Sequence, residues 1–167
     1  FPLGMAVDPE FASFYDTSAL KKTLTELVDF ELINSKDQMR LSVNALKVIT
    51  GALTSFDSAR QRLGVEHIMA SGALPPGFAP VRIDGDLYWD GGLYSNTPLD
   101  TVLDDEPRMN TLCFMVDLWS ADGPEPVTLD QVQTRQKDVM FASRSQQVIT
   151  EYLKLHHLRR TLHAVHG

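Results

Sequence analysis

One acidic residue, Asp90, lies between an apolar segment and a pair of glycines, in the stretch WDGGLYSNTPL at residues 89–99. The preceding residues 82–89 carry an Asp-Gly pair between two short apolar runs, which predicts a β-hairpin. We therefore expect Asp90 at or just beyond the end of the second strand. Gly91 and Gly92 allow a sharp turn and a close backbone approach, so that a neighbouring side chain can point into a cleft. Two interpretations remain open: a carboxylate placed for chemistry, or an Asx turn that caps its own loop.

Two further segments stand upstream of this stretch, RLSVNAL at residues 40–46 and EHIMASGALPPGFAPV at residues 66–81. In order and spacing, the three segments resemble patatin-like phospholipases over most of the chain. In that family an Ala-Ser-rich helix and a Pro-x-x-Phe-x-Pro turn precede a strand that ends in Asp-Gly-Gly or Asp-Gly-Ala. The resemblance implies that Asp90 is the acid of a Ser-Asp catalytic dyad, with Gly91 and Gly92 as its turn. Residues 116–120 and 143–145 resemble the bacterial branch of the family.

The nucleophile of such a dyad is not found in this sequence. A patatin-like enzyme carries a Gly-rich oxyanion loop and a Gly-x-Ser-x-Gly elbow, and both are missing from the 167 residues. Ser71 comes closest, but it lacks the glycine two positions before it, and we expect its hydroxyl to bond the backbone. We therefore expect residues 1–167 to be the C-terminal part of a patatin-like domain, incomplete at the N-terminus and inactive alone.

Composition places the chain among ordinary globular proteins. Hydrophobic residues make up 43% and charged residues 22% of the sequence. The net charge of -7 argues against a nucleic-acid partner, because binding phosphates needs clustered Lys and Arg. The single cysteine, Cys113, lies in an apolar run and is expected to pack as a small hydrophobe. We expect a cytoplasmic or membrane-peripheral location.

Helical and strand patterns alternate along the chain. Cap residues at 16–18 precede helical spacing that ends near Asp29, and residues 64–73 predict a helix stopped by two prolines. Residues 40–53 predict a strand that bends at Gly51, with a partner strand at 54–56. The apolar run at 111–118 predicts a strand buried on both faces. A long helical stretch is expected at about 129–163. These elements predict an α/β fold, and the family resemblance implies the three-layer α/β/α arrangement.

Two other groups of side chains are weighed as rival sites. His156, His157, His163 and His166 crowd the C-terminus, but their spacing matches no known ligand motif, so we expect no metal. Asp117 ends an apolar run as Asp90 does, but glycines do not flank it, and the resemblance gives it no catalytic part.

The resemblance implies a hydrolase of acyl esters in lipids, acting in lipid degradation without a cofactor. A serine outside this chain attacks the ester carbonyl, and Asp90 takes the proton as general base. The expected partner is a lipid or acyl ester substrate, with peripheral membrane contact. The alternative is a non-catalytic lipid-binding or interaction module on the same fold. If an N-terminal part is missing, the strands at 82–89 and 111–118 should pair with it or with a second copy.

Overall fold

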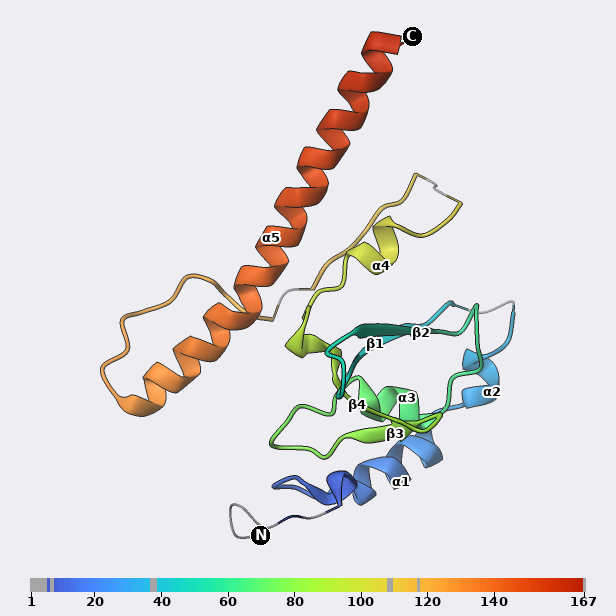
Figure 1. The fold of residues 1–167 in the computed structure, drawn as a ribbon, viewed down its shortest axis with the longest axis vertical. Coiled ribbons are helices and arrows are strands. Elements are labelled where there is room, and N and C mark those ends of the chain that lie inside the picture. The colour runs from blue at the N-terminus through green and yellow to red at the C-terminus, as the bar shows by residue number, and fades with distance from the viewer. Residues whose placement is uncertain (1–5, 7, 37–38, 108–109, 117, 167) are drawn as a thin grey trace. The chain divides into compact units, whose positions relative to one another are not determined.

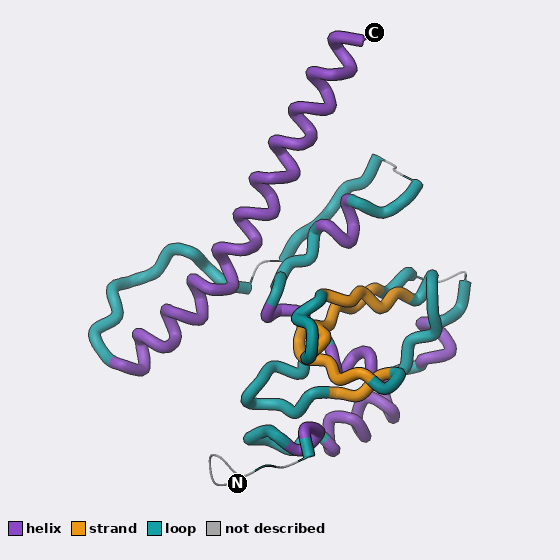
Figure 2. Tube along the Cα trace, in the orientation of Figure 1, coloured by secondary structure: helices purple, strands orange, loops and turns teal. Residues whose placement is uncertain are grey.

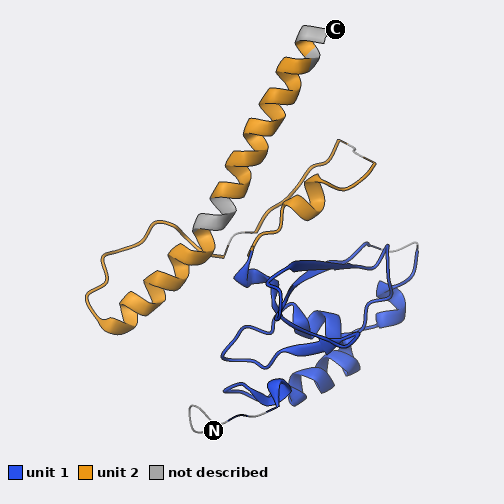
Figure 3. Cartoon of the chain, in the orientation of Figure 1, with its two compact units in different colours: residues 1–94 blue, residues 95–167 orange. Residues whose placement is uncertain are grey.

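The structure is a computed structural model, and it describes residues 6, 8–36, 39–107, 110–116 and 118–166 (Figure 1). The chain divides into two compact units, residues 1–94 and residues 95–167 (Figure 3). Each unit has its own internal contacts and is described by itself.

Unit 1 contains a four-stranded antiparallel sheet, formed by the strands drawn in orange in Figure 2. Its strands are β1 (Ser42–Lys47), β2 (Leu53–Asp57), β3 (Val81–Ile83) and β4 (Asp86–Asp90), in the order β2-β1-β4-β3. Together with the surrounding helices, this sheet confirms the predicted α/β class.

The strand predicted at 40–53 is two strands joined by a turn. β1 ends at Lys47, and the chain reverses through Gly51, whose φ of +68° is a conformation that glycine adopts without strain. β2 then begins at Leu53 and pairs with β1 in a register that sets Ala45 opposite Thr54. The sequence pattern placed the bend correctly, but the reversal at this bend is complete.

The hairpin predicted at 82–89 is confirmed. Asp84 and Gly85 both have positive φ, 49° and 89°, as the central residues of a type I′ turn require. β3 and β4 flank this turn, and Asp90 is the last residue of β4. The hairpin therefore delivers Asp90 to the end of a strand, as the sequence predicted.

The hydrophobic core of unit 1 lies between one face of the sheet and helix α3 (Val65–Ala70). Helix α1 (Ser18–Leu27) contacts α3, and both helices confirm predicted ones, although α3 is shorter than expected. The Phe56 ring meets Tyr88 edge-on at 5.3 Å and His67 at 4.8 Å between ring centroids. Side chains directly opposite one another on paired strands share a face, so the Ala45–Asp90 pairing puts Asp90 on this core-facing side. The buried core residues are Ala45, Phe56, Leu63, Ala70, Ile83 and Tyr88.

Unit 1 also has three shorter helical elements, and Ile33 of one of them packs against this core. They are the 3₁₀ helix η1 (Pro9–Phe11), helix α2 (Phe30–Ile33) and the 3₁₀ helix η2 (Gly91–Leu93), which directly follows Asp90.

Unit 2 contains α4 (Asp100–Leu103) and the long helix α5 (Leu129–His166), which confirms the helix predicted at 129–163. The loop before α5 folds back on the N-terminal half of this helix. There the Trp119 ring stacks on Phe141 at 5.2 Å between centroids, and the Arg135 guanidinium donates to the Ser120 carbonyl at 3.1 Å. Farther along α5, the Tyr152 hydroxyl donates to the Asp104 carboxylate at 2.7 Å. Within the described parts of the chain, neither α5 nor any other helix has a long enough apolar stretch to cross a membrane.

The buried strand predicted at 111–118 is wrong for the residues of this segment that the structure describes. These residues form no strand, and Leu112, Phe114 and Val116 are 81%, 86% and 79% exposed. Cys113 is exposed as well, rather than packed as a small hydrophobe. A buried strand needs neighbours on both edges and both faces, and the four described strands pair only with one another. The rival carboxylate, Asp117, lies outside the described residues.

Candidate active site

Both the backbone and the side chain of Asp90 form hydrogen bonds that hold the residue in place. Its backbone N–H donates to the Ala73 carbonyl at 3.0 Å, which ties the end of β4 to the loop after α3. Its side-chain Oδ1 accepts the Gly92 N–H at 2.7 Å and so caps η2. The second oxygen, Oδ2, accepts no hydrogen bond from the part of the chain that is described. The hydrogen bond to Oδ1 therefore orients the carboxylate, while Oδ2 can still accept a hydrogen bond or a proton.

The first glycine after Asp90 is required by a close contact with β1. A Cβ placed on Gly91 would lie 2.5 Å from the Asn44 carbonyl oxygen and 2.7 Å from its carbon, both backbone atoms that cannot swing aside. Gly91 is buried at this contact. The turn after Asp90 thus packs against segment 40–46. No sequence pattern predicted this contact.

Burial governs the electrostatics of Asp90. Desolvation raises the pKa of this half-buried carboxyl above its ordinary value, and the Gly92 N–H opposes the rise in part. No cation in the described segments adds to these causes. A carboxylate with a raised pKa holds a proton more readily, which suits a general base.

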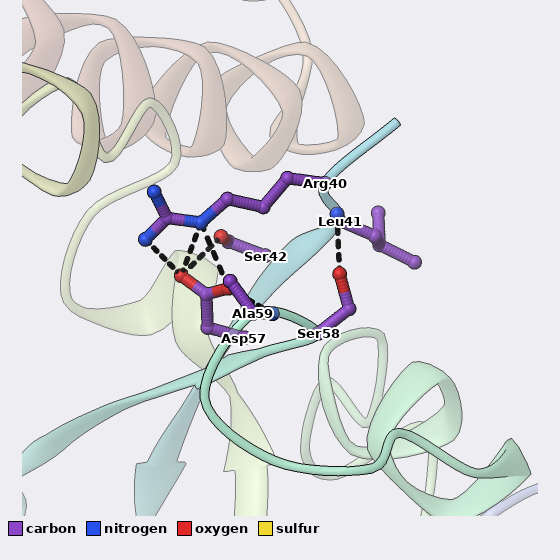
Figure 4. A network of polar contacts seen from close by, with 6 residues as sticks. All are labelled: Arg40, Leu41, Ser42, Asp57, Ser58 and Ala59. Atoms are coloured by element: carbon purple, nitrogen blue, oxygen red, sulfur yellow. Dashed lines mark hydrogen bonds and ion pairs between the residues drawn. The ribbon is translucent and has the colours of Figure 1, made fainter. Parts of the chain in front are cut away.

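A second carboxylate, Asp57, ends strand β2 in a different setting (Figure 4). The Arg40 Nε lies 2.9 Å from each of its oxygens, and the Ser42 hydroxyl donates to Oδ2 at 3.0 Å. The Ala59 N–H donates to Oδ1 at 2.8 Å. Arg40 foremost among these donors lowers the pKa of Asp57 to about 2. Only 3% of the surface of Asp57 is exposed. Its hydrogen bonds connect the start of β1 with the end of β2, so Asp57 is a structural residue.

Sequence reasoning did not single out Asp57. Arg40 stood in one of the segments that resemble the family, but its partner lies 17 positions away across the hairpin. An Arg and an Asp that flank two short strands on either side are the only signal that could have suggested the pair.

Ser71 and the C-terminal histidines are the other candidate site residues. The Ser71 hydroxyl donates to the Ile68 carbonyl at 2.8 Å, which confirms that it bonds the backbone. His156 and His157 lie on α5, and the described side chains include no group of three or more possible metal ligands. The side chains of His163 and His166 are outside what the structure describes.

A family model matches the part of the chain that contains Asp57 and Asp90. The family model described as patatin-like phospholipase matches residues 8–103, a span that includes all four strands, α3 and Asp90. The match covers more than half of the chain, so the protein belongs to the patatin-like phospholipase family, a family of lipid acyl hydrolases. No curated protein matches the chain.

Proposed function

We propose that this protein is part of a lipid acyl hydrolase in which Asp90 is the acid of a Ser-Asp dyad. The observation that carries the proposal is the setting of Asp90, a carboxylate at a strand end with one oxygen oriented by the Gly92 N–H and a pKa raised by burial. Family membership supplies the reaction class, and the sequence WDGG at residues 89–92 supplies the matching motif. The nucleophilic serine comes from outside these 167 residues.

The proposed reaction proceeds in two halves. In the first, the serine oxygen bonds to the ester carbonyl carbon while the Asp90 carboxylate takes the hydroxyl proton. The tetrahedral intermediate then expels the alcohol, which leaves with that proton, and an acyl-serine remains. In the second half, Asp90 takes a proton from water as the water oxygen attacks the acyl group, and the serine regains the proton. Asp90 works through Oδ2, because Oδ1 is held by Gly92.

The 167-residue chain alone should hydrolyse p-nitrophenyl esters at the background rate. A dyad acid without its nucleophile provides no covalent step, and the Ser71 hydroxyl is engaged by the backbone. Product release measured by absorbance, with buffer as the blank, tests this expectation. A rate above background that Asp90→Asn abolishes would show that the chain holds its own nucleophile and would overturn this part of the proposal.

We propose further that the apolar segment 111–118 pairs with another polypeptide segment or with a second copy of the chain. Its described apolar side chains are mostly exposed, and large contiguous apolar patches are rare on stable monomers. Light scattering on the purified chain should therefore report self-association or aggregation. A monodisperse monomer would contradict this pairing.

The second candidate function is a lipid-binding module without catalysis. It is favoured by the Asp90–Gly92 hydrogen bond, since a carboxylate that caps its own turn has a structural role already. The two functions differ in one sequence feature, a Gly-x-Ser-x-Gly segment encoded upstream of residue 1. Its presence supports the hydrolase, and its absence supports the binding module.

A further inference from the structure

Four aromatic side chains of unit 1 are exposed although they belong to an ordered part of the fold. Phe11, Phe14, Tyr15 and Phe78 are 66%, 69%, 65% and 37% exposed, and we call them the aromatic cluster. They come from two segments that are far apart in sequence. Solvent-facing rings contribute little to the core, so folding alone does not account for them.

Backbone hydrogen bonds hold the two segments of the cluster together. The Phe14 N–H donates to the Pro76 carbonyl at 3.0 Å, and the Tyr15 N–H donates to the Gly77 carbonyl at 2.9 Å. Tyr15 and Phe78 form a parallel bridge, with their ring centroids 6.1 Å apart. In Figure 1 the blue N-terminal segment contains Phe11, Phe14 and Tyr15, and the green segment between α3 and β3 contains Phe78. The rings are therefore presented on a fixed backbone.

The same loop connects the cluster with Asp90. The Ala73 carbonyl accepts the Asp90 N–H at 3.0 Å, and Pro76, three positions later, accepts the Phe14 N–H. The loop between α3 and β3 thus contacts the candidate catalytic acid at its start and the aromatic cluster farther along. A surface bound by the cluster would lie along the loop that supports Asp90.

Acidic groups flank the cluster and indicate which surface it fits. Asp8, Glu10 and Asp16 lie within three positions of its rings in sequence, and Arg82 is paired with Glu10. Because Arg82 neutralises Glu10, the net negative charge of these segments comes from Asp8 and Asp16, and it repels an anionic surface. Aromatic faces and carboxylates together attract quaternary ammonium groups, through cation–π and ionic interactions. Tyr and other aromatic side chains also favour the membrane–water interface.

We propose that the aromatic cluster docks this protein on a choline-bearing, zwitterionic lipid surface. The proposal deepens the proposed function, because it names the kind of surface from which an acyl-ester substrate would be drawn. The docking itself requires no catalysis, so it can be tested on the chain as it stands.

The test measures partition of the 167-residue chain onto phosphatidylcholine vesicles by co-sedimentation. The double variant Phe11→Ala/Phe14→Ala should bind about tenfold more weakly or worse, because two large apolar side chains no longer enter the interface. The double variant Leu27→Ala/Ile49→Ala is the matched control, since both side chains are large, apolar and exposed in unit 1 but lie outside the cluster. Its binding should equal that of the unchanged chain. Phosphatidylglycerol vesicles should bind the chain more weakly than phosphatidylcholine vesicles.

A second variant guards against misfolding of the alanine variant. Phe14→Trp keeps an aromatic ring, should retain binding, and should show a blue-shifted tryptophan emission when phosphatidylcholine vesicles are added. The proposal is overturned if the chain does not bind phosphatidylcholine, if it prefers phosphatidylglycerol, or if the cluster and control variants bind equally. It is also overturned if the cluster substitutions abolish self-association in light scattering and leave vesicle binding unchanged.

Failure of this proposal is distinguishable from failure of the proposed function. Asp90→Asn should leave vesicle binding unchanged, since Asp90 is not part of the cluster. Vesicle binding through the cluster, without any Asp90-dependent hydrolysis in a longer chain of the family, would support docking and reject the hydrolase.

Discussion

Asp57 and Asp90 are two carboxylates of one sheet that share the same local turn. Each is the last residue of its strand, and each accepts, through Oδ1, the N–H of the residue two positions later, at 2.8 Å for Asp57 and 2.7 Å for Asp90. They differ in what reaches their other oxygen. Arg40 and Ser42 donate hydrogen bonds to Oδ2 of Asp57, whereas none of the described groups donates to Oδ2 of Asp90.

That difference sets the direction of the two pKa shifts. Arg40 lowers the pKa of Asp57 to about 2, and burial raises the pKa of Asp90. An Asx turn alone therefore does not decide between structural and catalytic use. A neighbouring cation makes the carboxylate part of the framework, and an open oxygen leaves it able to exchange a proton.

Removing the charge of Asp57 should have the largest effect on stability. Asp57→Asn should lower the free energy of unfolding by about 2 to 3 kcal/mol at neutral pH, because it breaks charge-assisted hydrogen bonds in a buried site. The lowered pKa of Asp57 means that its contribution is present above its ordinary value near 3.8 and is lost as the pH falls towards 2. Denaturant unfolding at a series of pH values gives the free energy of unfolding of the unchanged chain and of Asp57→Asn. The difference between these two free energies should shrink by about 2 kcal/mol as the pH falls through this range.

Asp86→Asn is the control for this prediction. Asp86 pairs with Lys47, but both side chains are partly exposed, so its loss should cost less than about 1 kcal/mol. Equal costs for the two substitutions would mean that Asp57 is not the structural carboxylate of the sheet.

A smaller effect is expected from the turn after Asp90. Gly91→Ala should destabilise the chain by about 1 to 3 kcal/mol, because the new Cβ would overlap the Asn44 carbonyl and force the backbone to move. Gly72→Ala is the matched control, since a Cβ at Gly72 meets no atom within 4 Å. Thermal unfolding followed by circular dichroism compares them. Equal stability of the two variants would contradict the close contact between η2 and β1.

Turns and hairpins that depend on neighbouring residues in the sequence could be predicted from local patterns. The Asp84-Gly85 turn fixes the β3–β4 hairpin, because it depends on positive φ values that few residues adopt. The turn after Asp90 is equally local, because the Asp90 carboxylate accepts the N–H of Gly92 two positions later. The Arg40–Asp57 pair and the Asn44–Gly91 contact depend on which strands become neighbours. The apolar run at 111–118 could not be placed for the same reason, since an apolar pattern signals suitability for burial and does not supply the neighbours that would bury it.

The central claim is that Asp90 serves catalysis while Asp57 serves the framework. The most direct measurement is kcat for lipid ester hydrolysis by a longer chain of the family that carries a Gly-x-Ser-x-Gly segment ahead of these residues, with each aspartate replaced by asparagine in turn. Asp90→Asn should lower kcat by about 10² to 10⁴ and leave the free energy of unfolding nearly unchanged. Asp57→Asn should retain kcat per folded molecule while stability falls. Near-normal turnover in Asp90→Asn would contradict the account.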